Sequence, residues 1–208
     1  MAHHIRHTYN TLAGFQKRLL LARQRYPKKK LPADGLTTAA VLVPIFQKNH
    51  NLHVLLTKRS DMVEHHRGEI SFPGGKLDST DPDIRSCALR ETSEEVGVSP
   101  DDVQVLTELD DFYTVATRFH VVPFVGIIPY PYEFRVSQRE IAGLVAPPLE
   151  VFFDPSRRHE DVWIFRGAPV QVVSYLWEGH NIWGATARIL SHLVELIESQ
   201  EHKNEFTK

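Results

Sequence analysis

The chain has 208 residues, 42% of them apolar, which is long enough to bury one substantial hydrophobic core and predicts one elaborated domain. Its 24 basic and 26 acidic residues give a formal net charge of -2, which argues against the positive field that holds DNA or RNA. The single cysteine, Cys87, excludes an internal disulfide and a cysteine-based zinc site, and it indicates a cytoplasmic protein.

The first 33 residues contain no acid, although they carry eight lysines and arginines. An organellar transit peptide can have such a composition, and it stays an alternative. An amphipathic surface helix that stops at Pro27 is the favoured interpretation, because apolar residues recur there at helical spacing: Leu12, Phe15, Leu19, Ala22 and Tyr26. We expect residues 1–35 to form a basic helix and turn that packs on the domain.

The next segments predict strands and a long loop. Residues 38–46 are rich in Ala, Val, Leu and Ile between turn residues, which predicts a buried strand, and residues 53–58 predict its partner across a hairpin at 48–51. Residues 59–82 are polar and glycine-containing, so we expect a loop with at most a short strand near residues 70–72. The apolar runs are far too short to span a bilayer, so we expect no membrane partner.

The second half of the chain continues the mixed pattern. Residues 83–96 predict a helix that begins near Asp83 and ends at Gly97. Beyond it we expect strands over 103–109 and 121–128, a short helix or turn over 137–143, a hairpin from 162–165 and 170–177, and a core helix over 184–199. Because no repeat divides the chain, we expect one α/β domain over 36–199 and a polar tail over 200–208.

Three glutamates crowd one patch of the helix over residues 83–96. Glu91 and Glu95 lie one turn apart on the same face, and Glu94 lies beside them. Like charges at this spacing repel one another, so the arrangement favours a compensating cation such as Mg²⁺ or Mn²⁺, which can also bind substrate phosphates. For three glutamates by themselves, a solvated acidic face is the alternative.

The residues around the acids favour the metal site. Gly74 and Gly75 offer backbone that can approach a phosphate or donate a carbonyl oxygen to a metal. The stretch over residues 72–98, FPGGKLDSTDPDIRSCALRETSEEVGV, resembles the Nudix box, with a match in register at Arg90, Glu91, Glu94, Glu95, Gly97 and Val98. Gly75 and Asp81 match the front half of the box only if one residue is inserted, and Thr92 stands where an aliphatic residue is usual.

A second resemblance accounts for that insertion. Residues 55–75, LLTKRSDMVEHHRGEISFPGG, are similar to the upstream signature of the coenzyme A diphosphatase subgroup, whose box is lengthened in this way. Glu64 departs from the signature, because the subgroup carries an arginine there; Arg67, His65 or His66 are candidates to replace it. Residues 123–129, Glu140 with the segment after it, and residues 182–190 also look like later segments of this subgroup.

The resemblance implies a Nudix α/β/α sandwich with a mixed β-sheet. It implies hydrolysis of the diphosphate of coenzyme A or a derivative to 4′-phosphopantetheine and adenosine 3′,5′-bisphosphate. It also implies Mg²⁺ or Mn²⁺ that activates water, held by Glu91, Glu94, Glu95 and the Gly75 carbonyl. Glu94, Glu95 and Glu140 are the predicted catalytic residues, with Glu140 the weakest of them because a lone acid is often a surface residue.

The remaining candidates concern substrate and partners. Arg59, His66 and Arg67 are the predicted substrate contacts, and Arg90 is expected to orient a box glutamate through a bidentate pair. Cys87 is expected to be a packed thiol rather than a nucleophile. Another diphosphatase substrate, such as ADP-ribose, NADH, a dinucleotide or a nucleoside triphosphate, stays open, as does a catalytically silent nucleotide-binding domain. The sequence leaves open whether the protein is a monomer or a homodimer, and whether free, oxidised or acyl coenzyme A is preferred.

Overall fold

The computed structural model describes residues 11–60, 68–114, 117–165 and 167–199. Its helices and strands are, in chain order, α2 (Leu12–Arg25), β1 (Thr37–Lys48), β2 (Asn51–Val54), β3 (Leu56–Arg59), β4 (Ile70–Ser71), β5 (Gly74–Lys76), α3 (Ile84–Val96), β6 (Gln104–Glu108), β7 (Phe112–Tyr113), β8 (Phe119–Ile127), β9 (Ile141–Val145), β10 (Arg158–Phe165), β11 (Ala168–Trp177), β12 (His180–Trp183) and α4 (Gly184–Glu198). Three short 3-10 turns interrupt the loops, at Pro100–Asp102, Leu149–Phe153 and Pro155–Arg157. Within these described ranges, no helix is both long and apolar enough to cross a membrane.

The central sheet has the strand order β2-β1-β8-β6, with β5 also pairing β1 and β7 also pairing β8. β1 and β8 run parallel in a continuous register from Thr37 opposite Phe119 to Ile45 opposite Ile127, while the other pairs of this sheet are antiparallel. Two smaller three-stranded sheets have the orders β4-β3-β9 and β10-β11-β12. The central sheet therefore contains both parallel and antiparallel pairs, which is the mixed sheet that the sequence predicted.

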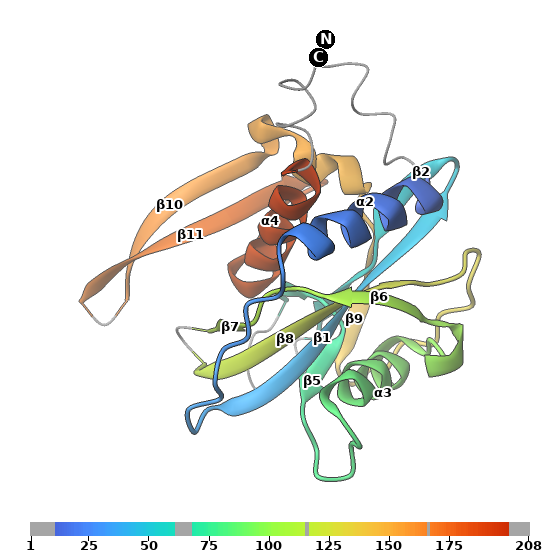
Figure 1. The fold of residues 1–208 in the computed structure, drawn as a ribbon, viewed down its shortest axis with the longest axis horizontal. Helices are drawn as coiled ribbons and strands as arrows, with labels where there is room; N and C mark the ends of the chain where they lie inside the picture. The colour runs from blue at the N-terminus through green and yellow to red at the C-terminus, as the bar shows by residue number, and fades with distance from the viewer. Residues whose placement is uncertain (1–10, 61–67, 115–116, 166, 200–208) are drawn as a thin grey trace.

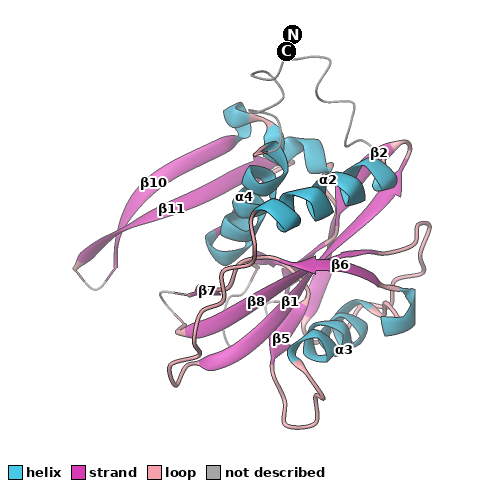
Figure 2. Ribbon diagram, viewed as in Figure 1, coloured by secondary structure: helices cyan, strands magenta, loops and turns pink. Residues whose placement is uncertain are grey.

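Helices cover both faces of the central sheet, with α3 on one side and α2 and α4 on the other (Figures 1 and 2). Successive residues of a strand point to opposite faces, so Leu42 of β1 packs in the same cluster as Cys87 of α3, whereas Val43 packs with Phe15 of α2 and Leu193 of α4. A strand covered on both faces reads as a continuous apolar run, which is why residues 38–46 contain so few polar residues. The expected α/β/α sandwich is confirmed.

The N-terminal helix ends where the sequence indicates. Thr11 caps α2 by accepting a hydrogen bond from the Gly14 N–H at 3.1 Å, and the helix stops before Pro27. Phe15, Leu19 and Ala22 are buried in the core shared with α4, but Tyr26, which the periodicity placed on the same stripe, is exposed.

Two expected elements have other bounds than the sequence indicated. Residues 53–58 form two strands rather than one, because β2 pairs with β1 up to Val54, whereas β3 begins at Leu56 and pairs with β4 and β9 in the second sheet. The expected short helix or turn over 137–143 stops early, because the N–H groups of Glu140 and Ile141 close a turn on Ser137 O and Ile141 already begins β9. β9 pairs with β3, which lies much earlier in the chain, so no local pattern indicates it.

Candidate active site

Helix α3 is fixed at both ends. The Asp83 carboxylate caps its first turn by accepting from the Ser86 N–H at 2.7 Å. At the other end Gly97 has φ +74°, and the N–H groups of Arg135 and Ser137 donate to the Val96 and Glu95 carbonyls at 3.0 and 2.9 Å. The loop that follows β8 therefore satisfies backbone carbonyls in the last turn of α3, which carries two of the three glutamates.

Strand β5 places backbone directly against the acidic face of α3. The Gly74 N–H donates to Glu95 Oε2 at 3.3 Å. A β-carbon on Gly75 would lie 2.4 Å from Glu91 Cδ and 2.5 Å from both carboxylate oxygens, so only glycine leaves room for this carboxylate. Gly74 is equally constrained, because its φ is +154° and a β-carbon there would lie 2.3 Å from the Ala40 carbonyl oxygen.

Glu95 is a buried carboxylate with little compensating charge. Its pKa is raised to about 8, mainly by burial and also by the negative charges of Glu91 and Glu140, against the opposing effects of the Gly74 N–H and the Arg59 guanidinium. Burial likewise raises the pKa of Glu91, against the ion pair with Arg90, and the charge of Glu140 again adds to the increase. Glu140, although exposed, therefore lies close enough for its charge to raise the pKa of both glutamates.

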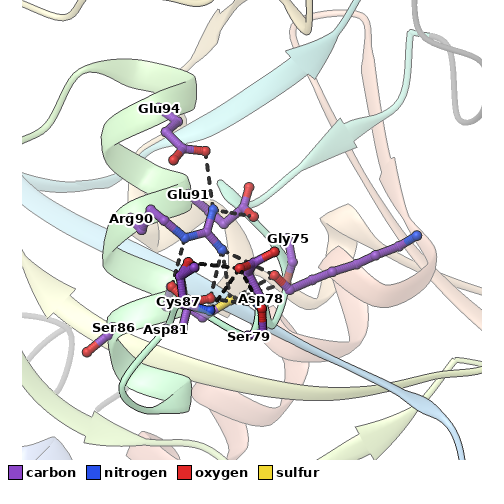
Figure 3. Close-up of polar contacts among 12 residues, drawn as sticks. Gly75, Asp78, Ser79, Asp81, Ser86, Cys87, Arg90, Glu91 and Glu94 are labelled. Atoms are coloured by element: carbon purple, nitrogen blue, oxygen red, sulfur yellow. Dashed lines mark hydrogen bonds and ion pairs between the residues drawn. The ribbon is translucent and has the colours of Figure 1, made fainter.

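Arg90 holds the outer side of this acidic patch (Figure 3). Its guanidinium donates two hydrogen bonds to Asp81, at 2.8 and 2.9 Å, and single bonds to Glu91 at 2.8 Å and Glu94 at 3.2 Å. The sequence had suggested a bidentate pair between Arg90 and a box glutamate, but the bidentate partner is Asp81. Arg90 does contact two of the box glutamates through single hydrogen bonds. Glu94 differs from its neighbours, since its side chain is 61% exposed.

Asp81 is the residue whose role sequence reasoning missed. The hydrogen bonds from Arg90 lower its pKa to about 2, so it stays ionised and fixes the guanidinium beside Glu91. A signal for this role was present, because Asp81 occupies the acid position of the lengthened box. The direct contact across nine residues depends on how the loop after β5 folds back on α3, which the sequence does not display.

Comparisons with known proteins identify the family of this chain. The family pattern described as NUDIX domain matches residues 36–163. The chain is 36% identical over 183 residues to the protein named Uncharacterized Nudix hydrolase NudL from Enterobacter sp. (strain 638), covering 88% of this chain and 93% of that protein. It is 37% identical over 159 residues to the protein of the same name from Yersinia pestis (strain Pestoides F), with 76% and 79% covered. The chain belongs to the Nudix hydrolase family.

A solved structure supports the same fold. The Nudix hydrolase described here is similar to the MutT/nudix family protein from Enterococcus faecalis, with a TM-score of 0.54 at 18% identity, covering 94% of this chain and 74% of that one. At this identity the likeness concerns the fold alone. Membership of the family makes the protein a hydrolase of nucleoside diphosphate derivatives, and Nudix hydrolases generally use divalent metal ions.

The acidic patch of this Nudix hydrolase fits a divalent cation. Glu91 and Glu95 are held beside glycine backbone, and burial, with a smaller effect of the Glu140 charge, raises the pKa of both carboxylates, so a bound cation would favour their ionised forms. Among the described residues no group of three His, Cys, Asp or Glu side chains forms a complete metal cluster. That is compatible with Mg²⁺, which keeps several water ligands and uses one or two carboxylates together with substrate phosphates.

The structure of this Nudix hydrolase describes some, but not all, of the other predicted site residues. Arg59 lies at the end of β3, and its positive charge acts on Glu95. His66 and Arg67, predicted to contact substrate, lie outside the described residues. Cys87 is buried, with its thiol 3.3 Å from the Lys76 carbonyl oxygen, and burial raises its pKa to about 11, so it is a packed thiol, as expected.

A separate cavity of about 940 Å³ lies at the far end of the central sheet. Its lining includes Gln47, His50, Gln104 and Tyr130. β5 pairs with β1 at residues 39–41, so Gln47 is about 20 Å further along the strand from Gly75. None of the predicted site residues that the structure describes lines this cavity, so it is a different feature from the acidic patch.

Proposed function

We propose that this Nudix hydrolase cleaves the diphosphate of coenzyme A or a derivative, giving 4′-phosphopantetheine and adenosine 3′,5′-bisphosphate. The observation that carries the proposal is that the upstream signature of residues 55–75 frames the acidic patch. Its first part forms β3 and ends at Arg59, and its last part forms β4 and β5 against α3. The cytoplasmic location that the single cysteine predicts belongs to the same proposal.

Arg59 supports a substrate rich in phosphate. Its Nε atom is buried and has no hydrogen-bond partner among the described residues, so a guanidinium N–H is available next to Glu95. Arginine recognises phosphate through paired N–H donors, and coenzyme A carries a 3′-phosphate in addition to its diphosphate. We assign Arg59 to phosphate binding, with His66 and Arg67 as the further substrate contacts.

The proposed metal ligands are Glu91, Glu95 and the Gly75 carbonyl, with Glu94 completing the set. When bound there, Mg²⁺ or Mn²⁺ would neutralise charge on the diphosphate and make water a better nucleophile. Arg90, held by Asp81, fixes the carboxylate of Glu91 so that it does not drift when substrate arrives.

The reaction is a displacement at phosphorus. A water oxygen bonds to one phosphorus, the bond from that phosphorus to the bridging oxygen breaks, and the bridging oxygen leaves on the other phosphate. The proton released by the water passes to a carboxylate, for which we favour Glu140 among the outer acids because its charge acts on both Glu91 and Glu95.

Product analysis tests the proposal. The protein is incubated with Mg²⁺ and, in separate reactions, coenzyme A, dephospho-coenzyme A, ADP-ribose, NADH and a dinucleotide tetraphosphate, and kcat/KM is compared. We expect coenzyme A to give the highest value, with the two products named above, and dephospho-coenzyme A, which lacks the 3′-phosphate, to give a lower value.

A matched variant examines the contribution of Arg59. Arg59→Ala is expected to raise KM for coenzyme A, whereas Lys58→Ala, on the exposed side of the same strand, is expected to leave KM unchanged. A higher kcat/KM for ADP-ribose or NADH than for coenzyme A would assign the enzyme to another substrate of the family.

A further inference from the structure

The hairpin of β10 and β11 extends away from the rest of the molecule (Figure 1). β10 forms one side of its sheet, and β11 is its only strand partner among the residues that the structure describes. The pairing runs without a bulge from Arg158 opposite Tyr175 to Phe165 opposite Ala168. The other side of β10 therefore presents a regular row of backbone N–H and C=O groups to a further strand.

The same strand carries the most exposed of the large apolar side chains in the described part of the chain. Val162 is 63% exposed and Ile164 is 70% exposed, and they share one face of the strand. Trp163, between them, points to the other face and is partly covered by a ring contact with Trp183, at a centroid distance of 5.2 Å. Exposed apolar side chains beside an open strand edge mark a surface that another strand can cover.

The second half of β10 lacks the charged residues and proline that normally protect such an edge. The strand contains no proline or lysine, and its charged residues, Arg158, Glu160 and Asp161, lie in its first half, with Arg158 already paired to Glu160. The second half, from Val162 to Phe165, carries no charge. An unprotected edge that is not covered makes a protein prone to open-ended association, so a closed arrangement is the stable solution.

We propose that β10 is a dimerisation edge, on which two copies of this chain pair antiparallel about a twofold axis. A second copy fits this edge because antiparallel pairing about such an axis uses the open side of both strands and leaves none for a third chain. The two three-stranded sheets then join into a continuous sheet of six strands, with the hairpins side by side.

The charge and apolar pattern selects the register. With Trp163 at the twofold axis, Val162 of each copy lies opposite Ile164 of the other, and Asp161 lies opposite Phe165. With Glu160 at the axis, two identical acids would face each other, and with Val162 at the axis Glu160 and Asp161 would face Ile164 and Trp163. Only the first of these registers pairs the exposed aliphatic side chains with each other, which is the favourable cross-strand contact.

Solution mass tests the association itself. Sedimentation velocity of the full chain at concentrations up to on the order of 100 μM is expected to show a species of twice the 23.8 kDa of one chain. Val162→Lys and Ile164→Lys are expected to raise the dimer dissociation constant at least about tenfold, because each change occurs twice in a twofold interface. Circular dichroism and diphosphatase activity report whether each variant is folded.

Leu176→Lys is the matched control. Leu176 is exposed in the same small sheet, but it lies on β11, where β10 and β12 already occupy both sides. The control variant is expected to dimerise as the parent does. A chain that stays monomeric at the highest concentration, or a dimer that Leu176→Lys disrupts while Ile164→Lys does not, would overturn the proposal.

Disulfide trapping tests the register. Residues directly opposite each other in an antiparallel pair have Cα atoms about 4.5 to 5.5 Å apart, which a disulfide can bridge. A mixture of the variants Val162→Cys and Ile164→Cys is therefore expected to form a cross-linked dimer on mild oxidation, and either variant by itself far less, since Cys87 is buried and does not compete. A mixture that cross-links no better than each variant by itself would exclude the Trp163-centred pairing.

Discussion

Replacing Gly75 with alanine puts a methyl carbon where the structure holds the carboxylate of Glu91. The new carbon would lie 2.4 Å from Glu91 Cδ, whereas carbon atoms in contact lie about 3.5 Å apart, so the carboxylate must retreat by about 1 Å. Gly75 does not have a positive φ, so alanine brings no backbone strain. The group that yields is the end of a flexible side chain, and the free energy of unfolding should change by less than about 0.5 kcal/mol.

The expected effect is on turnover. A displacement of about 1 Å in a catalytic group can lower the rate about 100-fold, which is about 2.7 kcal/mol of transition-state stabilisation. Steady-state kcat/KM for the preferred diphosphate substrate at saturating Mg²⁺ measures the effect, and urea unfolding measures stability. Gly143→Ala is the control, because a β-carbon there meets nothing within 4 Å, and it should change neither quantity.

A double-mutant cycle then assigns the loss to Glu91. If Gly75→Ala acts by displacing that carboxylate, the same change should cost little in a Glu91→Gln background. Near-normal turnover in Gly75→Ala would refute the argument that glycine positions Glu91. Full additivity of the two changes would refute it as well, because the alanine would then act through another group.

Three further predictions concern the frame around the site. Asp81→Asn should reduce turnover by about 10- to 100-fold at limiting Mg²⁺, because Arg90 loses its charged partner; unchanged magnesium dependence would contradict this role. Gly97→Ala should lower the free energy of unfolding by about 1 to 3 kcal/mol in urea melts, because φ is +74° and the neighbouring loop is in contact; an unchanged midpoint would argue against it. Although burial opposes it, the ion pair with Lys28 helps to hold the pKa of Asp111 below 3.8. This pair therefore stabilises the fold above pH 3.8 and loses its effect as pH falls through the lowered pKa. Lys28→Met should make acid unfolding less steep, and an identical pH profile would contradict the assignment.

The sequence predicted those elements whose patterns are local. Asp83 at the start of α3 and Gly97 at its end indicate the bounds of that helix, and a broad apolar stripe indicates α4. Both helices lie where the sequence pattern predicted them. The turn of β1 and β2 was equally visible, since Asn49 and His50 are residues that accept the positive φ of a two-residue hairpin.

The elements that the sequence did not predict depend on distant partners. β5 consists of Gly74, Gly75 and Lys76, which have little strand propensity, and it forms because it pairs with β1. β9 pairs with β3, and Leu55 separates β2, which pairs with β1, from β3, which pairs with β4 and β9. In each of these cases, contacts with residues distant in the sequence determine which residues form a strand.

The candidate site shows the same division. Helical spacing placed Glu91, Glu94 and Glu95 near one another, but it could not show that Glu95 is buried while Glu94 is largely exposed, since that depends on which face meets β5. The partner of Arg90 also lay beyond sequence reasoning, because the loop that carries Asp81 must first fold back on α3.

Turnover of Glu95→Gln at saturating Mg²⁺ tests the central claim most directly, because the amide has the shape of the buried carboxylate without its charge. With the fold verified by circular dichroism, kcat is predicted to fall on the order of 10³-fold or more, since the charge that binds the cation is removed. A variant that cleaves the diphosphate at nearly the parent rate would contradict the assignment of this carboxylate to the metal and, with it, the catalytic account given for α3.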